Sequence, residues 1–243
     1  MFVRMLAAGA ALALAATSSA LAQGAKPLRT LTFDVAYSVV SSLTARNNGL
    51  GSGGLDVASG SGFESHGFAQ DDKGTVRVDV VAATADGGLV VDASFSGEKV
   101  RQPPVRIAIL GDGRLAYDPK LVLPPELTEL LPMLSRGLLT GHDATVGTAW
   151  SATAPEPWTG TRRFRVSAAN DTTATFAIDT DFSIKGSQGY EQHDEGSLTY
   201  QKTVLAPLRY DTRIRIRRKG LRGDELNDLH LTATLTSDSF VPK

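Results

Sequence analysis

Apolar and polar residues alternate along most of the chain. In the stretch 31–39 the odd positions are apolar and the positions between them are small or polar. The same pattern recurs at 76–80, 89–95, 174–182, 208–216 and 229–235. A period of two is typical of strands with one face buried and the other in water, as in antiparallel sheets. The chain is therefore predicted to be mainly β.

Short clusters of Asp, Asn and Gly separate these runs. They are Asp71-Asp72-Lys73-Gly74, Asp86-Gly87-Gly88, Asp112-Gly113, Asn170-Asp171 and Arg222-Gly223-Asp224. Such residues favour tight turns, because they accept positive φ angles or bond to their own backbone. Asp112-Gly113, between the apolar stretches 107–110 and 115–117, is the sharpest hairpin signal. No regular alternation of strand and helix is present, which argues against a parallel α/β sheet.

One segment, 125–138, departs from the strand pattern. Proline is compatible with the first turn of a helix, so Pro125 can begin one. Pro132 should then kink or divide it, because proline lacks a backbone N–H. Leucines follow at helical spacing, at Leu127, Leu130, Leu131, Leu134 and Leu138. This stripe needs a partner, and the apolar face of the sheet is the one available.

Together these patterns predict one domain over residues 23–243. We expect nine or ten antiparallel strands in meander order, forming a large curved sheet, an open or half-closed barrel. The short helix over 125–138 should pack in its concave face. A sheet of this size tends to coil. A two-sheet β-sandwich built from the same strands is the alternative.

The first 22 residues are predicted to be a signal peptide. Arg4 precedes an apolar run over 6–16, and Ala20-Leu21-Ala22 fits a cleavage site. The run is too short to span a membrane, which takes roughly 20 residues. The chain has no cysteine, so disulfides and thiolate metal sites are excluded. Export without disulfides favours a bacterial periplasm, with secretion or the cell surface as alternatives.

Residues 44–62 contain six glycines and few large apolar groups. We expect a flexible loop there, serving either as an idle surface segment or as a flap over a cavity.

Candidate chemistry is sparse. The formal net charge is −1, and no aromatic ladder accompanies the arginines, so a nucleic-acid partner is not expected. The only cluster of possible metal ligands is His193-Asp194-Glu195 with Glu191, in a Gly-bounded segment predicted to be a loop. No nucleophile elbow or phosphate loop is present. We predict no metal, no cofactor and no catalytic residue, and a hydrolase with paired carboxylates is the least supported function.

Two binding surfaces are predicted. Leu127, Leu130, Leu131 and Leu134, together with Trp150, could contact an apolar ligand between sheet and helix. Arg209, Arg213, Arg215 and Arg217 share one face of a strand. Guanidinium groups at that spacing suit an anionic partner, although a solvent face balanced by neighbouring Asp and Glu is the plainer interpretation.

The order of elements resembles a known superfamily. The segment from Leu123-Pro124-Pro125-Glu126-Leu127 through Val146-Gly147-Thr148-Ala149-Trp150 resembles uncharacterised bacterial exported domains, which are similar in layout to open-barrel lipoprotein carriers. This resemblance implies a curved sheet over a helical plug that binds acyl chains. The leucine-rich helix, the candidate flap at 44–62 and the export signal lead us to expect an exported, non-enzymatic carrier or sensor of a lipid or other amphiphile. The alternative is an envelope interaction module that uses the arginine-rich face to contact an anionic envelope component.

Overall fold

The computed structural model describes residues 26–45, 68–136, 139, 141–153, 158–184, 189–204, 206–219 and 223–240. The predicted signal peptide lies outside these residues, as does the glycine-rich segment beyond residue 45. The described chain is mainly β, as predicted. Its strands are β1 (Arg29–Ala45), β2 (Phe68–Ala83), β3 (Leu89–Gly97), β4 (Arg101–Ile109), β5 (Leu115–Ala116), β6 (Ala149–Thr153), β7 (Trp158–Ala169), β8 (Thr173–Ile184), β9 (Tyr190–Gln201), β10 (Ala206–Lys219) and β11 (Gly223–Asp238).

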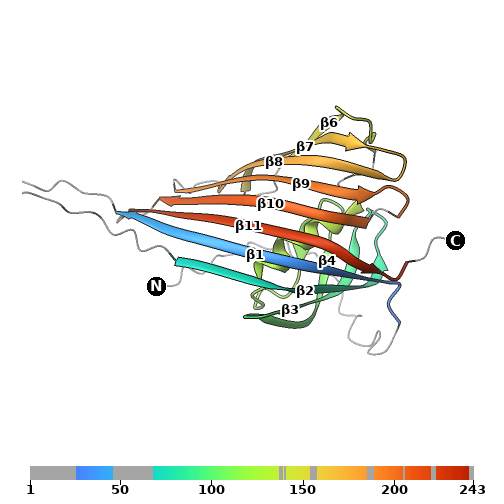
Figure 1. Cartoon of the computed structure of the whole chain (residues 1–243), viewed down its shortest axis with the longest axis horizontal. Helices are drawn as coiled ribbons and strands as arrows, with labels where there is room; N and C mark the ends of the chain where they lie inside the picture. The colour runs from blue at the N-terminus through green and yellow to red at the C-terminus, as the bar shows by residue number, and fades with distance from the viewer. Residues whose placement is uncertain are drawn as a thin grey trace, which may run out of the picture.

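All eleven strands form one antiparallel sheet in the order β5-β4-β3-β2-β1-β11-β10-β9-β8-β7-β6. The sheet thus joins two meanders, β1–β5 and β6–β11, through the pairing of the first strand with the last (Figure 1). The sheet does not close, and β5 and β6 are its two edges. This confirms the predicted open antiparallel sheet, with eleven strands instead of nine or ten.

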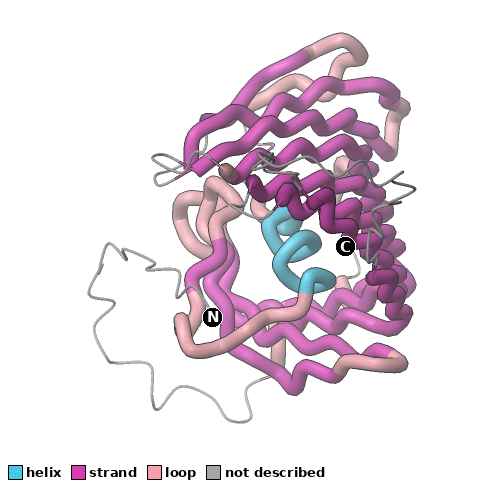
Figure 2. The backbone as a smooth tube through the Cα atoms, turned by 90° about the vertical axis from the view of Figure 1, so that its left-hand side faces the viewer, coloured by secondary structure: helices cyan, strands magenta, loops and turns pink. Residues whose placement is uncertain are grey.

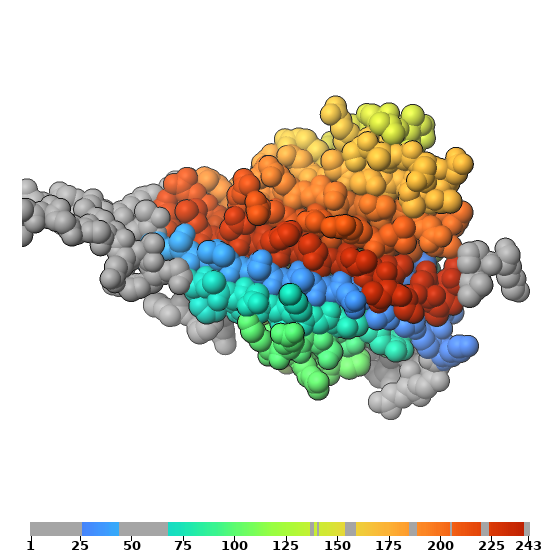
Figure 3. Space-filling view, in the orientation of Figure 1, coloured from blue at the N-terminus to red at the C-terminus, as the bar shows by residue number. Residues whose placement is uncertain are grey.

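The connection between the two edge strands carries the helical segment. Helix α1 (Pro125–Leu130) begins with Pro125 in its first turn, and the 3-10 helix η1 (Leu131–Leu134) follows at once. Figure 2 shows this segment in the hollow enclosed by the curved sheet. The division near Pro132 agrees with the predicted kink, and residues 137 and 138 lie outside the described chain. Figure 3 shows the opposite, outer face, where neighbouring strands lie as continuous bands.

The core lies between the inner face of the sheet and the helical segment. Leu127, Leu130 and Leu131 are fully buried against inward residues such as Phe33 and Val91. Helix α1 contacts β1, β3 and β11, whereas η1 contacts β4 and β10. The alternating residues of each strand therefore meet one short leucine-rich plug, which both halves of the sheet share.

Two hydrogen bonds anchor the end of the plug to hairpin turns. Ser135 Oγ donates to the Gly111 carbonyl at 2.7 Å. The Arg136 backbone N–H donates to the Gly87 carbonyl at 3.2 Å. Gly87 and Gly113 have φ angles of 83° and 84°, which confirms the predicted turns at Asp86-Gly87-Gly88 and Asp112-Gly113.

Two predictions of local structure are wrong. Asp71-Asp72-Lys73-Gly74 lies inside β2, not at a turn. A Cβ at Gly74 would clash with the backbone of β3, so this glycine allows two strands to approach closely. The segment that contains His193 is part of β9, not a loop. Its side chains alternate between the two faces of the sheet, so His193 and Asp194 point to opposite faces.

Candidate functional site

A cavity of about 440 Å³ lies on the concave side of the sheet, beside the helical segment. The plug, the β4–β5 hairpin, edge strand β6 and the inner face of β7–β11 enclose it. Its apolar lining includes Leu115, Met133, Phe182, Ile214 and Ile216. Its polar lining includes Arg114, Glu129, Arg162, Tyr190 and Gln192. An apolar pocket of this size with a few convergent polar groups is typical of small-ligand sites.

The two edges of the open sheet both line this cavity. Asp112 to Leu115 come from the β4–β5 hairpin at one edge, and Ala152 and Thr153 come from β6 at the other. Asp112 and Arg114 pair with each other at 2.6 Å on the rim. The gap that leaves the sheet unclosed is therefore also the entrance to the cavity.

Glu129 brings a carboxylate from α1 to the cavity wall. Burial, with Coulomb repulsion from Asp194, raises the pKa of Glu129 to about 7. No described residue donates a hydrogen bond to this carboxylate or forms an ion pair with it. Its surroundings therefore disfavour the charged form, and the cavity supplies its open side.

Arg162 is the cation whose charge lowers the pKa of this acid. It lies on β7, and its Nε donates to Thr180 Oγ1 at 3.3 Å. Its guanidinium lies over the Phe182 ring, 5.6 Å from the centroid. Its charge lowers the pKa of both Glu129 and Asp194, although burial outweighs this effect in each case. The charge of one arginine thus acts on two carboxyl groups.

Strand β9 supplies the polar floor of the cavity. Asp194 is only 5 % exposed and accepts a hydrogen bond from Gln192 Nε2 at 2.9 Å. Burial raises its pKa. The Tyr190 hydroxyl donates to Gln192 Oε1 at 2.7 Å. This chain of hydrogen bonds fixes the polar groups beneath the apolar walls.

No family model and no curated protein matches this chain. The site is therefore interpreted from its own geometry.

None of the five residues predicted to contact an apolar ligand lines this cavity. The four leucines, Leu127, Leu130, Leu131 and Leu134, are core residues at 0–3 % exposure. None of them lines the cavity of about 440 Å³, which lies beside them, next to Met133 and Pro132.

Trp150 lines a smaller cavity of about 230 Å³ with Phe176 and Tyr200. Its ring stacks between His142 and Phe164, at centroid distances of 4.3 and 5.3 Å. This stacking closes one end of the core.

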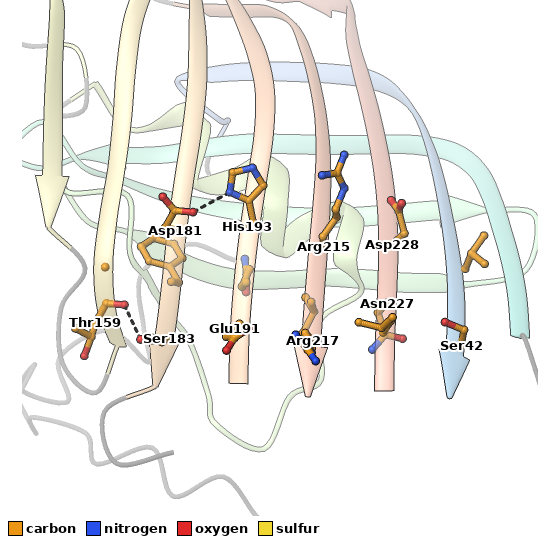
Figure 4. Close-up of a pocket in the computed structure, with 16 residues that line it drawn as sticks. Ser42, Thr159, Asp181, Ser183, Glu191, His193, Arg215, Arg217, Asn227 and Asp228 are labelled. Carbon is orange, nitrogen blue, oxygen red and sulfur yellow. Dashed lines mark hydrogen bonds and ion pairs between the residues drawn. The ribbon is translucent and has the colours of Figure 1, made fainter. Parts of the chain in front are cut away.

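The arginine face lies on the outside of the sheet, and a second hollow of about 800 Å³ lies beside it. Figure 4 shows Asp181, His193, Arg215 and Asp228 in one row across neighbouring strands. Every predicted arginine has a carboxylate partner. The pairs are Arg209–Asp211 at 3.6 Å, Arg213–Asp228 at 3.5 Å, Arg215–Glu195 at 3.8 Å and Arg217–Asp224 at 2.7 Å. The charge of the ladder is thus balanced within the chain.

His193 lies between two carboxylates of this face. Its Nε2 is 3.1 Å from Glu195 Oε1, and its Nδ1 is 2.8 Å from Asp181 Oδ1. Hydrogen bonds to Glu195 and Asp181 raise the pKa of His193. With both ring nitrogens engaged by acids, the imidazole favours its charged form and is unsuited to act as a general base.

Sequence reasoning missed Glu129, Arg162 and Gln192. Arg162 stands beside Arg163, but strand alternation directs one inward and the other outward, and this parity was available from the sequence. Glu129 was hidden within a leucine-rich segment. Among the described residues, no group of three His, Asp or Glu side chains is placed to hold a metal ion. No helix in the described part of the chain is long and apolar enough to cross a membrane.

Proposed function

We propose that this protein is an exported, non-enzymatic carrier or sensor that binds an amphiphile in the cavity between the helical plug and the sheet. One observation carries the proposal. The cavity of about 440 Å³ opens between the unpaired sheet edges and combines apolar walls with polar groups from β7 and β9. Such a site accepts an apolar chain together with one polar head.

The layout supports the same proposal. An open antiparallel sheet around a helical plug is the arrangement that the resemblance to open-barrel lipoprotein carriers implies. We extend the proposal to kinship with that superfamily and to function outside the cytoplasm.

The alternative, an envelope module that contacts an anionic component, receives less support. The predicted arginines already lie 2.7–3.8 Å from carboxylates of the same face. A partner would have to compete with these carboxylates for the guanidinium groups, so these four arginines offer no uncompensated positive charge.

Native mass spectrometry of protein purified from its own cell envelope tests the proposal. We expect a bound small molecule that solvent extraction releases. A matched pair of variants localises it. Ala152→Trp fills the cavity entrance, whereas Ser151→Trp places the same ring on the opposite face of β6.

We expect the bound mass to disappear in Ala152→Trp and to persist in Ser151→Trp. Equal retention in both variants, or no bound molecule in the unmodified protein, would contradict the proposal.

A further inference from the structure

Glu129 is the polar group of the cavity that most needs a partner. It lines the cavity from α1, with Met133 on the next turn and Ile214 and Ile216 on the facing strand. The structure gives its carboxylate no hydrogen bond and no ion pair with any described residue. A carboxylate in an apolar wall is unfavourable unless a cation or a hydrogen-bond donor meets it.

The resident cation is already engaged. Arg162 donates a hydrogen bond to Thr180 and covers the Phe182 ring. Its charge also lowers the pKa of both Glu129 and Asp194. Two acids, the partly buried Glu129 and the buried Asp194, therefore share one arginine. When all three groups are ionised, this part of the cavity carries a net negative charge.

The rim does not change this balance. Asp112 and Arg114 pair with each other on the β4–β5 hairpin. Arg218, over the Tyr190 ring at 5.8 Å, pairs with Glu225 at 3.8 Å. The unpaired charge is thus the carboxylate inside the cavity.

We infer that the cavity is selective for a cationic amphiphile, with an ammonium head group against Glu129 and an apolar tail along Met133, Ile214 and Ile216. This inference rests on the proposed function and names the ligand class of the same site. An ammonium group forms a charge-assisted hydrogen bond with the carboxylate. A carboxylate or phosphate head would instead place a third anion beside Glu129 and Asp194, with only Arg162 to compensate.

Binding of a cation should depend on pH. The titratable or charged groups near Glu129 are Tyr37 on β1, Asp112 and Arg114 on the hairpin, Glu126 on α1, Arg162 on β7, Tyr190 and Asp194 on β9, and Tyr210 on β10. A bound ammonium favours the ionised carboxyl, so binding releases a proton wherever the free acid is still protonated. Affinity for the cation should therefore rise as the pH rises through the titration of Glu129.

Three probes of equal chain length test the inference by isothermal titration calorimetry: octylammonium, 1-octanol and octanoate. The amine stays charged at both pH 6 and pH 8, because alkyl amines titrate near 10.4. The unmodified protein is compared with Glu129→Gln and with the control Glu98→Gln, which removes an exposed carboxylate far from the cavity.

At pH 8 we expect octylammonium to bind at least about tenfold more tightly than 1-octanol, a difference of about 1.4 kcal/mol. Glu129→Gln should abolish this preference, and Glu98→Gln should keep it. In the unmodified protein, affinity for octylammonium should rise from pH 6 to pH 8 while that for 1-octanol stays constant. This last comparison needs no variant.

The two proposals fail differently. Equal binding of 1-octanol and octylammonium, tightest binding of octanoate, or an unchanged preference in Glu129→Gln would overturn the inference. If one of these outcomes occurred but Ala152→Trp still blocked binding of the probes, the proposed function would stand without the inference. Binding of none of the three probes would contradict both.

Discussion

Arg29 on the first strand and Asp238 at the end of the last strand form a two-pronged ion pair. Arg29 Nε donates to Oδ1 at 2.9 Å, and Nη2 donates to Oδ2 at 2.6 Å. Arg29 Nη1 also donates to the Val204 carbonyl at 3.0 Å. The pair joins the two meanders at their shared boundary, where β1 meets β11. It therefore connects residues that are 209 positions apart in the chain.

Replacement of Arg29 should destabilise the whole sheet. Arg29→Met removes the guanidinium donors of Asp238 and of the Val204 carbonyl in a site where Arg29 is 9 % exposed, and Asp238 keeps the Phe240 N–H at 2.9 Å. We expect the free energy of unfolding to fall by about 2–4 kcal/mol. Urea denaturation measures this loss. The control Arg106→Met removes an exposed two-pronged pair with Asp92 and should cost less than about 1 kcal/mol. Equal losses would show that the β1–β11 pair has no special weight.

Asp72 on β2 organises the neighbouring β3–β4 turn. Its carboxylate accepts backbone N–H groups of Glu98 at 2.9 Å, Lys99 at 3.2 Å and Val100 at 3.0 Å. Asp72→Ala leaves the Lys99 and Val100 N–H groups without this acceptor, whereas the Glu98 N–H keeps the Lys73 carbonyl at 3.1 Å. The loss should cost about 1–3 kcal/mol, and amide hydrogen exchange at residues 99 and 100 should accelerate most. The control is Asp71→Ala, because Asp71 forms an exposed ion pair with the Lys99 side chain. Unchanged exchange in Asp72→Ala would refute this role.

The leucine plug should be a major source of stability. Leu130 is fully buried, so Leu130→Ala should lower the free energy of unfolding by about 2–5 kcal/mol through lost transfer energy and a new cavity. Leu121→Ala, at an exposed position before the helix, should change it by no more than about 0.5 kcal/mol. Thermal and urea denaturation compare the two variants. A similar small effect in both would mean that the plug is dispensable.

His193 should stabilise the fold at acidic to neutral pH. Its folded pKa is raised by Glu195 and Asp181, so its contribution is complete below the ordinary value near 6.5 and is lost as the pH rises through the folded value. In His193→Gln that decline in stability above pH 6.5 should vanish. His193→Lys keeps a charge that does not titrate in this range and should also give a flat profile. A decline that persists unchanged in both variants would assign it to other groups.

Glu129 should act on stability with the sign of a buried acid. Its pKa is raised to about 7, so the folded chain holds this proton longer than the unfolded chain does. Stability should therefore fall as the pH rises from about 4.5 through about 7. Glu129→Gln should reduce this fall, and Glu126 and Asp194, whose pKa values are also raised, should retain part of it. Urea denaturation at pH 5 and pH 8 measures the difference, with Glu98→Gln as control. A profile unchanged in Glu129→Gln would contradict the assignment.

Much of the fold could be predicted from local pattern. Strand alternation and turn residues depend on neighbours in sequence, so the run at 31–39, the Asp112-Gly113 hairpin and the proline-divided helix were all available. The pairing of β1 with β11 was not, because no local signal relates residues some 200 positions apart. Gly74 shows the same limit. Glycine favours turns, but here it makes room for a neighbouring strand.

The candidate site was less accessible from sequence. A leucine stripe indicates which side of a helix is buried, but not whether the space beside it is filled or hollow. The four predicted leucines fill the core, and the hollow lies next to Glu129, a residue whose isolated carboxylate gives no motif. The arginines of β10 stood out in sequence, yet the partners of Arg213, Arg215 and Arg217 lie on adjacent strands and became visible only in register.

The most direct test of the account is the position of a bound amphiphile. Crystals grown with 8-bromo-1-octanol would locate the bromine by anomalous scattering. We predict a peak in the cavity between Met133, Phe182 and Ile214, on the concave side of the sheet. A peak in the outer hollow beside Arg215, or none on either side at saturating ligand, would contradict binding in the cavity beside the plug.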